Sequence, residues 1–181
     1  MNLVFPSIVA VLFLIFIFAP NLCNSATLAK GNLQINNLNP KIIGTETKLL
    51  KKVGAKINTS ENKITIKGPE KIKSIKSIKT KEFPGIPTDL QAQLMVLMCK
   101  AVGKSSITES IFENRFMHVA ELQRLGAKIN IKNNTATIEG NTKFIGAELM
   151  SSDLRASVAL VLAAIVSVSY THLTLPTILL V

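Results

Sequence analysis

The chain contains 181 residues, with 21 Lys or Arg and 11 Asp or Glu, and its formal net charge is +10. Every charge lies between Lys30 and Arg155, where no apolar run approaches the roughly 18 residues of a membrane span, so a multi-span membrane protein is excluded. The abundance of Ile, Leu and Val excludes general disorder, and two cysteines are too few for a disulfide-rich module or a CxxC zinc site.

The positive charge is concentrated in the first part of this stretch. Residues 30–82 carry 13 Lys against 4 Glu and no Arg, whereas residues 83–155 carry 8 basic against 7 acidic residues. A Lys-rich half fits either an anionic partner or a solvated face. Because recognition of bases and phosphates favours Arg, and the chain has one Tyr and no Trp for stacking, no nucleic-acid partner is expected.

The uncharged leading end is similar to an export signal. Residues 8–19 are twelve uninterrupted apolar residues, followed by Pro20 and by a small residue, Ser25. No Lys or Arg precedes this run, however, and twelve residues are too few for a comfortable transmembrane helix. We therefore interpret residues 1–25 as a separate apolar leader, either a genuine signal or non-native sequence.

An internal repeat organises the rest of the chain. Residues 50–72 and 122–144 are identical at 11 of 23 positions without a gap, at an offset of 72. The sequence predicts strands at 33–37, 56–58 and 63–67, and again at 105–109, 128–131 and 135–139. It predicts helices at 40–53, 89–102, 114–125 and 153–166. Gly54 and Gly126 suit left-handed C-caps, and Thr88 and Ser152 suit N-caps.

The repeated unit is thus helix–strand–helix–strand–strand. Residues 26–166 form the predicted domain, with units at about 26–80 and 88–150 and the opening helix of a third at 153–166. The repeat also requires an Asp-led helix just before Ala29, and a Gly turn and a strand after Val166. Residues 1–25 lack the Asp, and the tail at 167–181, which alternates weakly like a strand, lacks the Gly. We interpret both ends as non-native and the chain as a fragment.

Three motifs resemble the enolpyruvyl transferase family: FPGIPTDLQAQ at 83–93, ITESIFENRFMHVAELQRLGAKI at 107–129 and SSDLRAS at 151–157. The resemblance implies an α/β (α+β) fold of repeated βαβαββ units, the inside-out α/β barrel of this family, here incomplete. It also implies transfer of the enolpyruvyl group from phosphoenolpyruvate to the 3-hydroxyl of UDP-N-acetylglucosamine, the first committed step of peptidoglycan synthesis in the cytoplasm. These two small molecules are the expected partners. No cofactor, metal or membrane is expected, and the chain alone is expected to be inactive.

The same resemblance implies roles for five residues. Asp89 in PTDLQAQ matches the base for the sugar hydroxyl and also contacts the nucleotide sugar. Ile111 matches a position that binds the nucleotide sugar through its main chain. Arg115 and Arg155 match arginines on the phosphoenolpyruvate side, and Asp153 matches the catalytic aspartate of its motif. A positioned carboxylate suits proton removal near neutral pH, and forked cationic donors suit phosphate and carboxylate groups.

Simpler interpretations stay open from the spacing alone. Asp89 and Asp153 fit acids at helix N-termini, and Arg115 fits a surface helix position. His118 fits a packed histidine, and Cys99 a small buried hydrophobe. A different class of function also remains: a secreted or membrane-tethered, non-enzymatic repeat module that binds anionic surfaces, exported if residues 1–25 are a signal.

Overall fold

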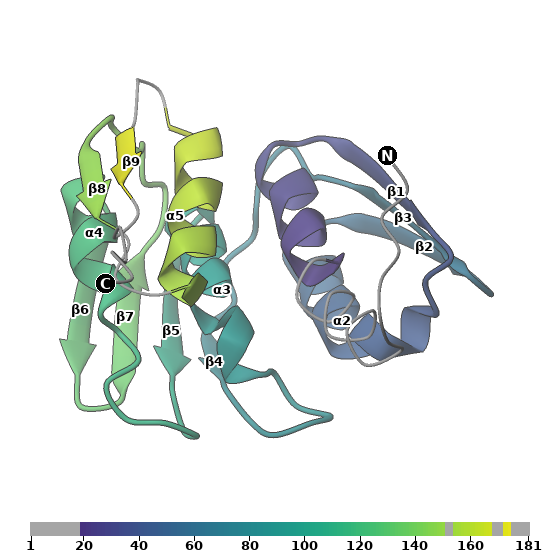
Figure 1. Ribbon diagram of the computed structural model, residues 1–181, viewed down its shortest axis with the longest axis horizontal. Helices are drawn as coiled ribbons and strands as arrows, with labels where there is room; N and C mark the ends of the chain where they lie inside the picture. Colours follow the sequence, from purple (N-terminus) through teal and green to yellow (C-terminus); the bar gives the residue numbers. More distant parts are fainter. Residues whose placement is uncertain (1–18, 151–153, 168–171, 175–181) are drawn as a thin grey trace, which may run out of the picture.

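The computed structural model describes residues 19–150, 154–167 and 172–174. Figure 1 shows the two larger sheets on opposite sides of the molecule, with most of the helices between them. This arrangement puts the apolar helices inside and the sheets outside. The α/β fold predicted from the repeat is therefore confirmed.

The first unit begins with a helix. Its described part covers residues 19–28. Its further elements are β1 (Asn32–Asn36), the 3-10 helix η1 (Pro40–Ile43), α2 (Gly44–Lys52), β2 (Lys56–Ser60) and β3 (Lys63–Lys67). The three strands form an antiparallel sheet in the order β1-β3-β2.

The second unit has one strand that the sequence did not predict. Its elements are β4 (Ser77–Lys79), η2 (Thr88–Leu90), α3 (Gln91–Lys100), β5 (Lys104–Thr108), α4 (His118–Arg124), β6 (Lys128–Lys132) and β7 (Thr135–Glu139). The sheet order is β4-β5-β7-β6, with β4 parallel to β5 and the other pairs antiparallel. This unit is a complete βαβαββ succession, as the family resemblance implies.

A third unit starts in the same way. β8 (Glu148–Met150) is followed by α5 (Leu154–Ile165) and β9 (His172–Thr174). β9 pairs in parallel with β8, just as β5 pairs with β4. The strand that the repeat requires after Val166 is thus present inside the tail at 167–181. Among the described residues the three sheets stay separate and close no barrel.

The helices and strands of the first two units correspond at the same offset of 72 as their amino-acid sequences. The helix at 19–28 corresponds to α3 at Gln91–Lys100, and β1, β2 and β3 correspond to β5, β6 and β7. Ala19, Cys23 and Leu28 of the first helix are buried in the same core as the later units. This helix crosses the boundary that we predicted between residues 25 and 26, although the division into leader, domain and tail stays a prediction.

The core is centred on α3. All nine residues from Gln91 to Cys99 are buried, so this helix has no solvent face. It packs against α5, β5 and β7. The predicted burial of Cys99 and His118 is confirmed. Burial raises the pKa of the Cys99 thiol to about 12, so this group stays protonated near neutral pH.

Two local predictions are wrong. Thr88 is not the N-cap of α3: η2 precedes the helix, and the N-cap residues are Pro87 for η2 and Leu90 for α3. The helix predicted at 114–125 begins only at His118, because Asn114 adopts a left-handed conformation (φ 56°) that no right-handed helix continues. Ser152 lies outside the described residues.

Candidate functional site

Asp89 lies on the exposed side of η2, between the loop that follows β4 and the start of α3. The hydroxyl of the preceding residue, Thr88, donates a hydrogen bond of 2.8 Å to the carboxylate of Glu109 and caps neither helix. The segment that carries Asp89 is therefore fixed to the end of β5 by its neighbour.

Ile111 and Arg115 lie in the loop between β5 and α4, and both line one hollow of about 1000 Å³. The other wall of this hollow is formed by β6 and the turn before β7, through Ile131, Asn133 and Asn134. The guanidinium carbon of Arg115 lies 4.6 Å from the ring centroid of Phe112, a cation–π contact that orients the fork. The structure thus brings two of the predicted site residues together.

Glu109, the residue after β5, holds the two segments together. Its side chain is 2% exposed, and its carboxylate accepts hydrogen bonds from four donors on three segments. The donors are the hydroxyls of Thr80 and Thr88, both at 2.8 Å, and the backbone N–H groups of Ile111 at 2.9 Å and Phe112 at 3.3 Å. Burial opposes ionisation, yet these hydrogen bonds prevail and hold the pKa of Glu109 below its ordinary value.

Glu109 is not among the site residues predicted from the sequence. The alternation along β5 was the available signal, since Ser105 and Ile107 are buried and Glu109 continues the same side of the strand. A carboxylate at an inward position needs partners, and the hydroxyl of Thr80 and the backbone of the following loop provide them. The motif at 107–129 contains both residues, but the family resemblance implied a role only for Arg115 and Ile111.

Of the remaining predicted residues, Arg155 belongs to α5. Asp153 lies outside the described residues, and the side chain of Arg155 lies outside what the structure describes. The described part of the chain contains no group of three or more His, Cys, Asp and Glu side chains placed to hold a metal ion. Its helices are also too short or too polar to cross a membrane.

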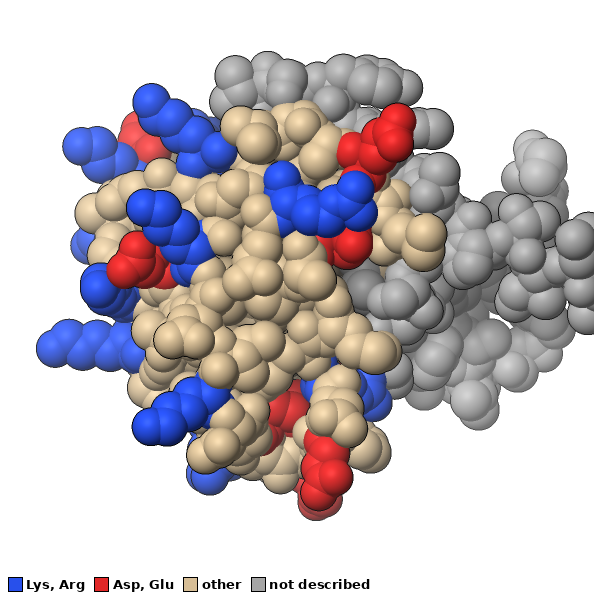
Figure 2. Space-filling model, turned by 90° about the vertical axis from the view of Figure 1, so that its left-hand side faces the viewer, with Lys and Arg blue, Asp and Glu red and all other residues tan. Residues whose placement is uncertain are grey.

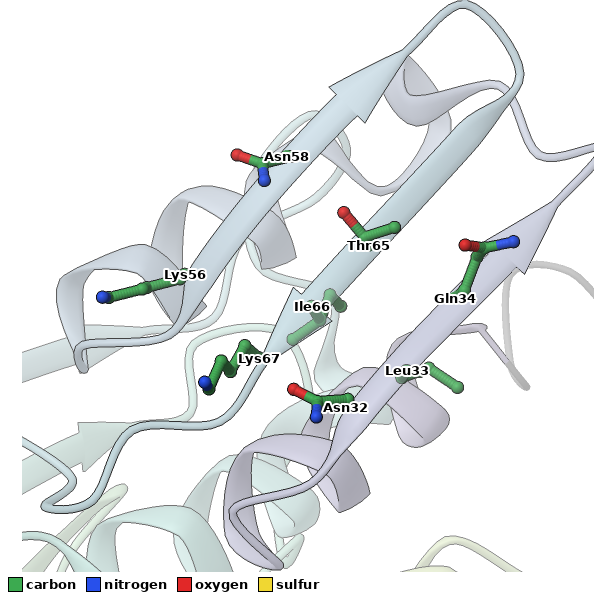
Figure 3. Close-up of a pocket in the computed structure, with 8 residues that line it drawn as sticks. All are labelled: Asn32, Leu33, Gln34, Lys56, Asn58, Thr65, Ile66 and Lys67. Atoms are coloured by element: carbon green, nitrogen blue, oxygen red, sulfur yellow. The ribbon is translucent and has the colours of Figure 1, made fainter.

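Two other surfaces carry polar side chains. A hollow of about 360 Å³ lies on the sheet of the first unit, where side chains from β1, β2 and β3 such as Asn32, Asn58 and Thr65 gather (Figure 3). It contains none of the predicted site residues. Figure 2 shows the end of the molecule formed by the second unit, where Lys and Arg side chains lie apart with acidic side chains among them. This end therefore presents no continuous basic stripe.

Comparison with known proteins agrees with this architecture. The EPSP synthase (3-phosphoshikimate 1-carboxyvinyltransferase) family matches residues 17–177. A UDP-N-acetylglucosamine 1-carboxyvinyltransferase of Pelagibacter ubique is 62% identical over 141 residues, which are 78% of this chain and 34% of the relative. One of Geotalea daltonii is 44% identical over 149 residues, 82% of this chain and 36% of the relative. The chain thus spans about a third of the length of these curated relatives.

Solved structures show the same fold. The crystal structure of an enolpyruvyl transferase from Streptomyces tendae superposes with a TM-score of 0.78 at 24% identity, over 90% of this chain and 38% of that one. An EPSP synthase of Acinetobacter baumannii superposes with a TM-score of 0.61 at 20% identity, over 83% of this chain and 39% of that one. With its βαβαββ unit and its family match across residues 17–177, the chain belongs to the EPSP synthase family of enolpyruvyl transferases.

Proposed function

We propose that this chain provides part of the active site of a UDP-N-acetylglucosamine 1-carboxyvinyltransferase. The observation that carries the proposal is the joined site: Ile111 and Arg115 share one hollow, and Glu109 links their loop to the segment of Asp89. Relatives with this activity in their names are 62% and 44% identical to the chain, which supports this member of the family.

The reaction joins the 3-oxygen of the sugar to the central carbon of phosphoenolpyruvate and releases phosphate. In this proposal the Asp89 carboxylate takes the proton of the sugar hydroxyl. The N–H of Ile111 already donates to Glu109, so its carbonyl oxygen is the main-chain group that contacts the nucleotide sugar. Arg115 offers forked donors to phosphate and carboxylate oxygens, and Asp153 and Arg155 complete the set.

This activity would place the chain in the cytoplasm at the first committed step of peptidoglycan synthesis, and so in cell wall formation. Its partners would be two small molecules, UDP-N-acetylglucosamine and phosphoenolpyruvate. Both substrates are anionic, which suits Arg115 with its fork oriented against Phe112.

A chimera tests the proposal, because the chain spans only about a third of its relatives. Residues 26–166 replace the matching segment of the Pelagibacter ubique relative, and phosphate release is measured with phosphoenolpyruvate and each of two acceptors. We expect turnover with UDP-N-acetylglucosamine and none with 3-phosphoshikimate. Asp89→Asn in the chimera should lower kcat by at least about 100-fold, as expected for loss of a general base.

The control is Glu70→Gln, which removes a carboxylate whose ion pair, within the described part of the chain, is with the exposed Lys30. It should leave kcat within about twofold. Turnover with 3-phosphoshikimate instead, or full activity of the Asp89→Asn chimera, would reject the proposed function.

A further inference from the structure

We propose that Glu109 is a positioning residue, whose carboxylate fixes the segment of Asp89 against the loop of Ile111 and Arg115. The inference rests on the proposed function, because that function gives Asp89, Ile111 and Arg115 their roles. The hydrogen bonds of Glu109 are observed in the structure independently of it. Glu109 lines one wall of the hollow, while its carboxylate oxygens are turned towards protein donors.

The two carboxylate oxygens hold different segments. Oε1 accepts from the Thr80 hydroxyl, which follows β4, and from the N–H groups of Ile111 and Phe112 in the β5–α4 loop. Oε2 accepts from the Thr88 hydroxyl in η2. One rigid planar group therefore sets the relative position of three chain segments. Thr80 and Thr88 lie 29 and 21 residues before Glu109, and the loop of Ile111 and Phe112 follows it directly.

Further hydrogen bonds hold Glu109 itself in place. Its N–H donates to the carbonyl oxygen of Asn134 at 2.8 Å. The N–H of Ser110 donates to the Thr80 hydroxyl oxygen at 2.9 Å, and the Ser110 hydroxyl donates to the Thr80 carbonyl oxygen. Glu109 is therefore held through its backbone and through the next residue as well as through its carboxylate.

The repeat shows that the fold of the unit does not require this carboxylate. The residue 72 positions earlier is Asn37, which is exposed and adopts a left-handed conformation with φ 58°. In the first unit the chain runs from Asn37 directly into η1, without a buried acid. The carboxylate is thus an addition in the unit that carries the predicted site residues.

The charge is essential to the arrangement. All four partners are donors, and an ionised carboxylate offers acceptor sites on both oxygens. Glu109→Gln keeps the shape but replaces one oxygen by an NH2 group, which would face donors from Thr88 or from Thr80 and the loop. Turned towards Thr88, whose hydroxyl also accepts, this NH2 group keeps that attachment. The remaining amide oxygen is neutral, so its hydrogen bonds from Thr80, Ile111 and Phe112 are weaker than those of the carboxylate.

The first experiment measures amide hydrogen exchange at Ile111 and Phe112 in the full chain at pH 7. Glu109→Gln should accelerate exchange at these two amides at least tenfold. The matched control is Glu139→Gln on the neighbouring strand β7. Among the described residues this carboxylate forms an ion pair with the exposed Lys104 at 3.1 Å. The control should leave both amides within about twofold of the wild type.

The second experiment measures the Kd of the chimera with the Pelagibacter ubique relative for UDP-N-acetylglucosamine by calorimetric titration, because the chimera supplies the rest of the proposed site. Glu109→Gln and Thr88→Val should each raise the Kd at least tenfold, whereas Thr88→Ser, which keeps the hydroxyl, should bind like the chimera without further substitutions. A role in packing alone would not separate Val from Ser in this way, because Val has the shape of Thr.

The outcomes separate the two proposals. Unchanged exchange in Glu109→Gln, or unchanged affinity of the Glu109→Gln chimera where the chimera without further substitutions binds, overturns the positioning role. A chimera without further substitutions that binds no UDP-N-acetylglucosamine counts against the proposed function of this chain. In that case the exchange rates at Ile111 and Phe112 alone decide whether Glu109 fixes the loop.

Discussion

Gly140 lies where the end of β7 passes the turn between α3 and β5. A Cβ at this position would overlap the carbonyl oxygen of Ala101 and come within 2.5 Å of that of Gly103. Its repeat partner Gly68 is also confined, since a Cβ there would lie 2.5 Å from the carbonyl oxygen of Ala26. The identity of these two glycines across the repeat therefore has a steric cause.

Gly140→Ala should lower the free energy of unfolding by at least about 2 kcal/mol, because backbone atoms cannot move aside as a flexible side chain can. Urea unfolding followed by circular dichroism measures this change. Gly44→Ala is the control, since the residue begins α2 and a Cβ there meets no described atom within 4 Å apart from its chain neighbours and the backbone of its own helix. The control should leave stability unchanged or raise it by up to about 1 kcal/mol. Equal losses in the two variants would contradict the steric explanation.

Glu109 should make stability depend on pH. Its pKa in the folded protein lies below the ordinary value of 4.5, so the unfolded chain binds the proton more readily. The contribution of this group is therefore complete above the ordinary value and is lost as the pH falls through the folded pKa. The free energy of unfolding, measured from pH 7 to pH 3, should fall less in Glu109→Gln than in the wild type. Parallel curves for the two proteins would refute this.

Single residues were predictable where the local backbone decides their role. Gly54 and Gly126 have φ values of 107° and 93°, as a left-handed C-cap requires, and both were predicted from their place after a helix. Thr88 was misassigned because a hydroxyl before a helix fits a cap and a tertiary partner equally well. Its actual acceptor, Glu109, is 21 residues away in the sequence, so the residues around Thr88 do not reveal this hydrogen bond.

Among the elements, those with alternating or helical periodicity were predicted to within a few residues. β4 and β8 were missed. Each is three residues long, too short for alternation, and each is held by parallel pairing with a strand that comes after a helix. Only the family resemblance implied them, because the βαβαββ unit needs a strand before each inner helix. The late start of α4 was missed because Asn114 looks like any polar helix residue in the pattern.

The burial of α3 on all sides leads to a prediction for the inner helices. Leu97 is completely buried, and truncation leaves a cavity that the packed neighbours cannot fill. Leu97→Ala should lower the free energy of unfolding by about 2–5 kcal/mol. Leu22→Ala, the same change at a position that is 47% exposed in the corresponding helix at 19–28, should cost less than about 1 kcal/mol. Chemical unfolding of both variants measures the difference, and similar losses would show that α3 is not the centre of the core.

At the scale of the molecule, the repeat describes more of the chain than composition does. Composition separates a charged middle from two uncharged ends. The repeat instead assigns the helix at 19–28 to the same place in its unit as α3, and the structure pairs β9 with β8 as it pairs β5 with β4. The physical reason is that inner helices in this fold are surrounded by protein and need no charge. An apolar stretch such as residues 8–19 therefore does not by itself distinguish an export signal from the core of a unit.

The site suggests what the chain can do by itself. Among the described side chains, Arg115 is the one arginine at the hollow, and the hollow is open to water. Phosphoenolpyruvate carries a phosphate and a carboxylate, and catalysis needs several preorganised cationic donors in a site that excludes water. We therefore expect the purified chain to release no phosphate from phosphoenolpyruvate with UDP-N-acetylglucosamine, whereas the chimera with the Pelagibacter ubique relative does. A continuous phosphate assay at equal protein concentrations makes the comparison. Turnover by the chain alone, abolished by Asp89→Asn, would show that one third of the relatives' length suffices for the chemistry.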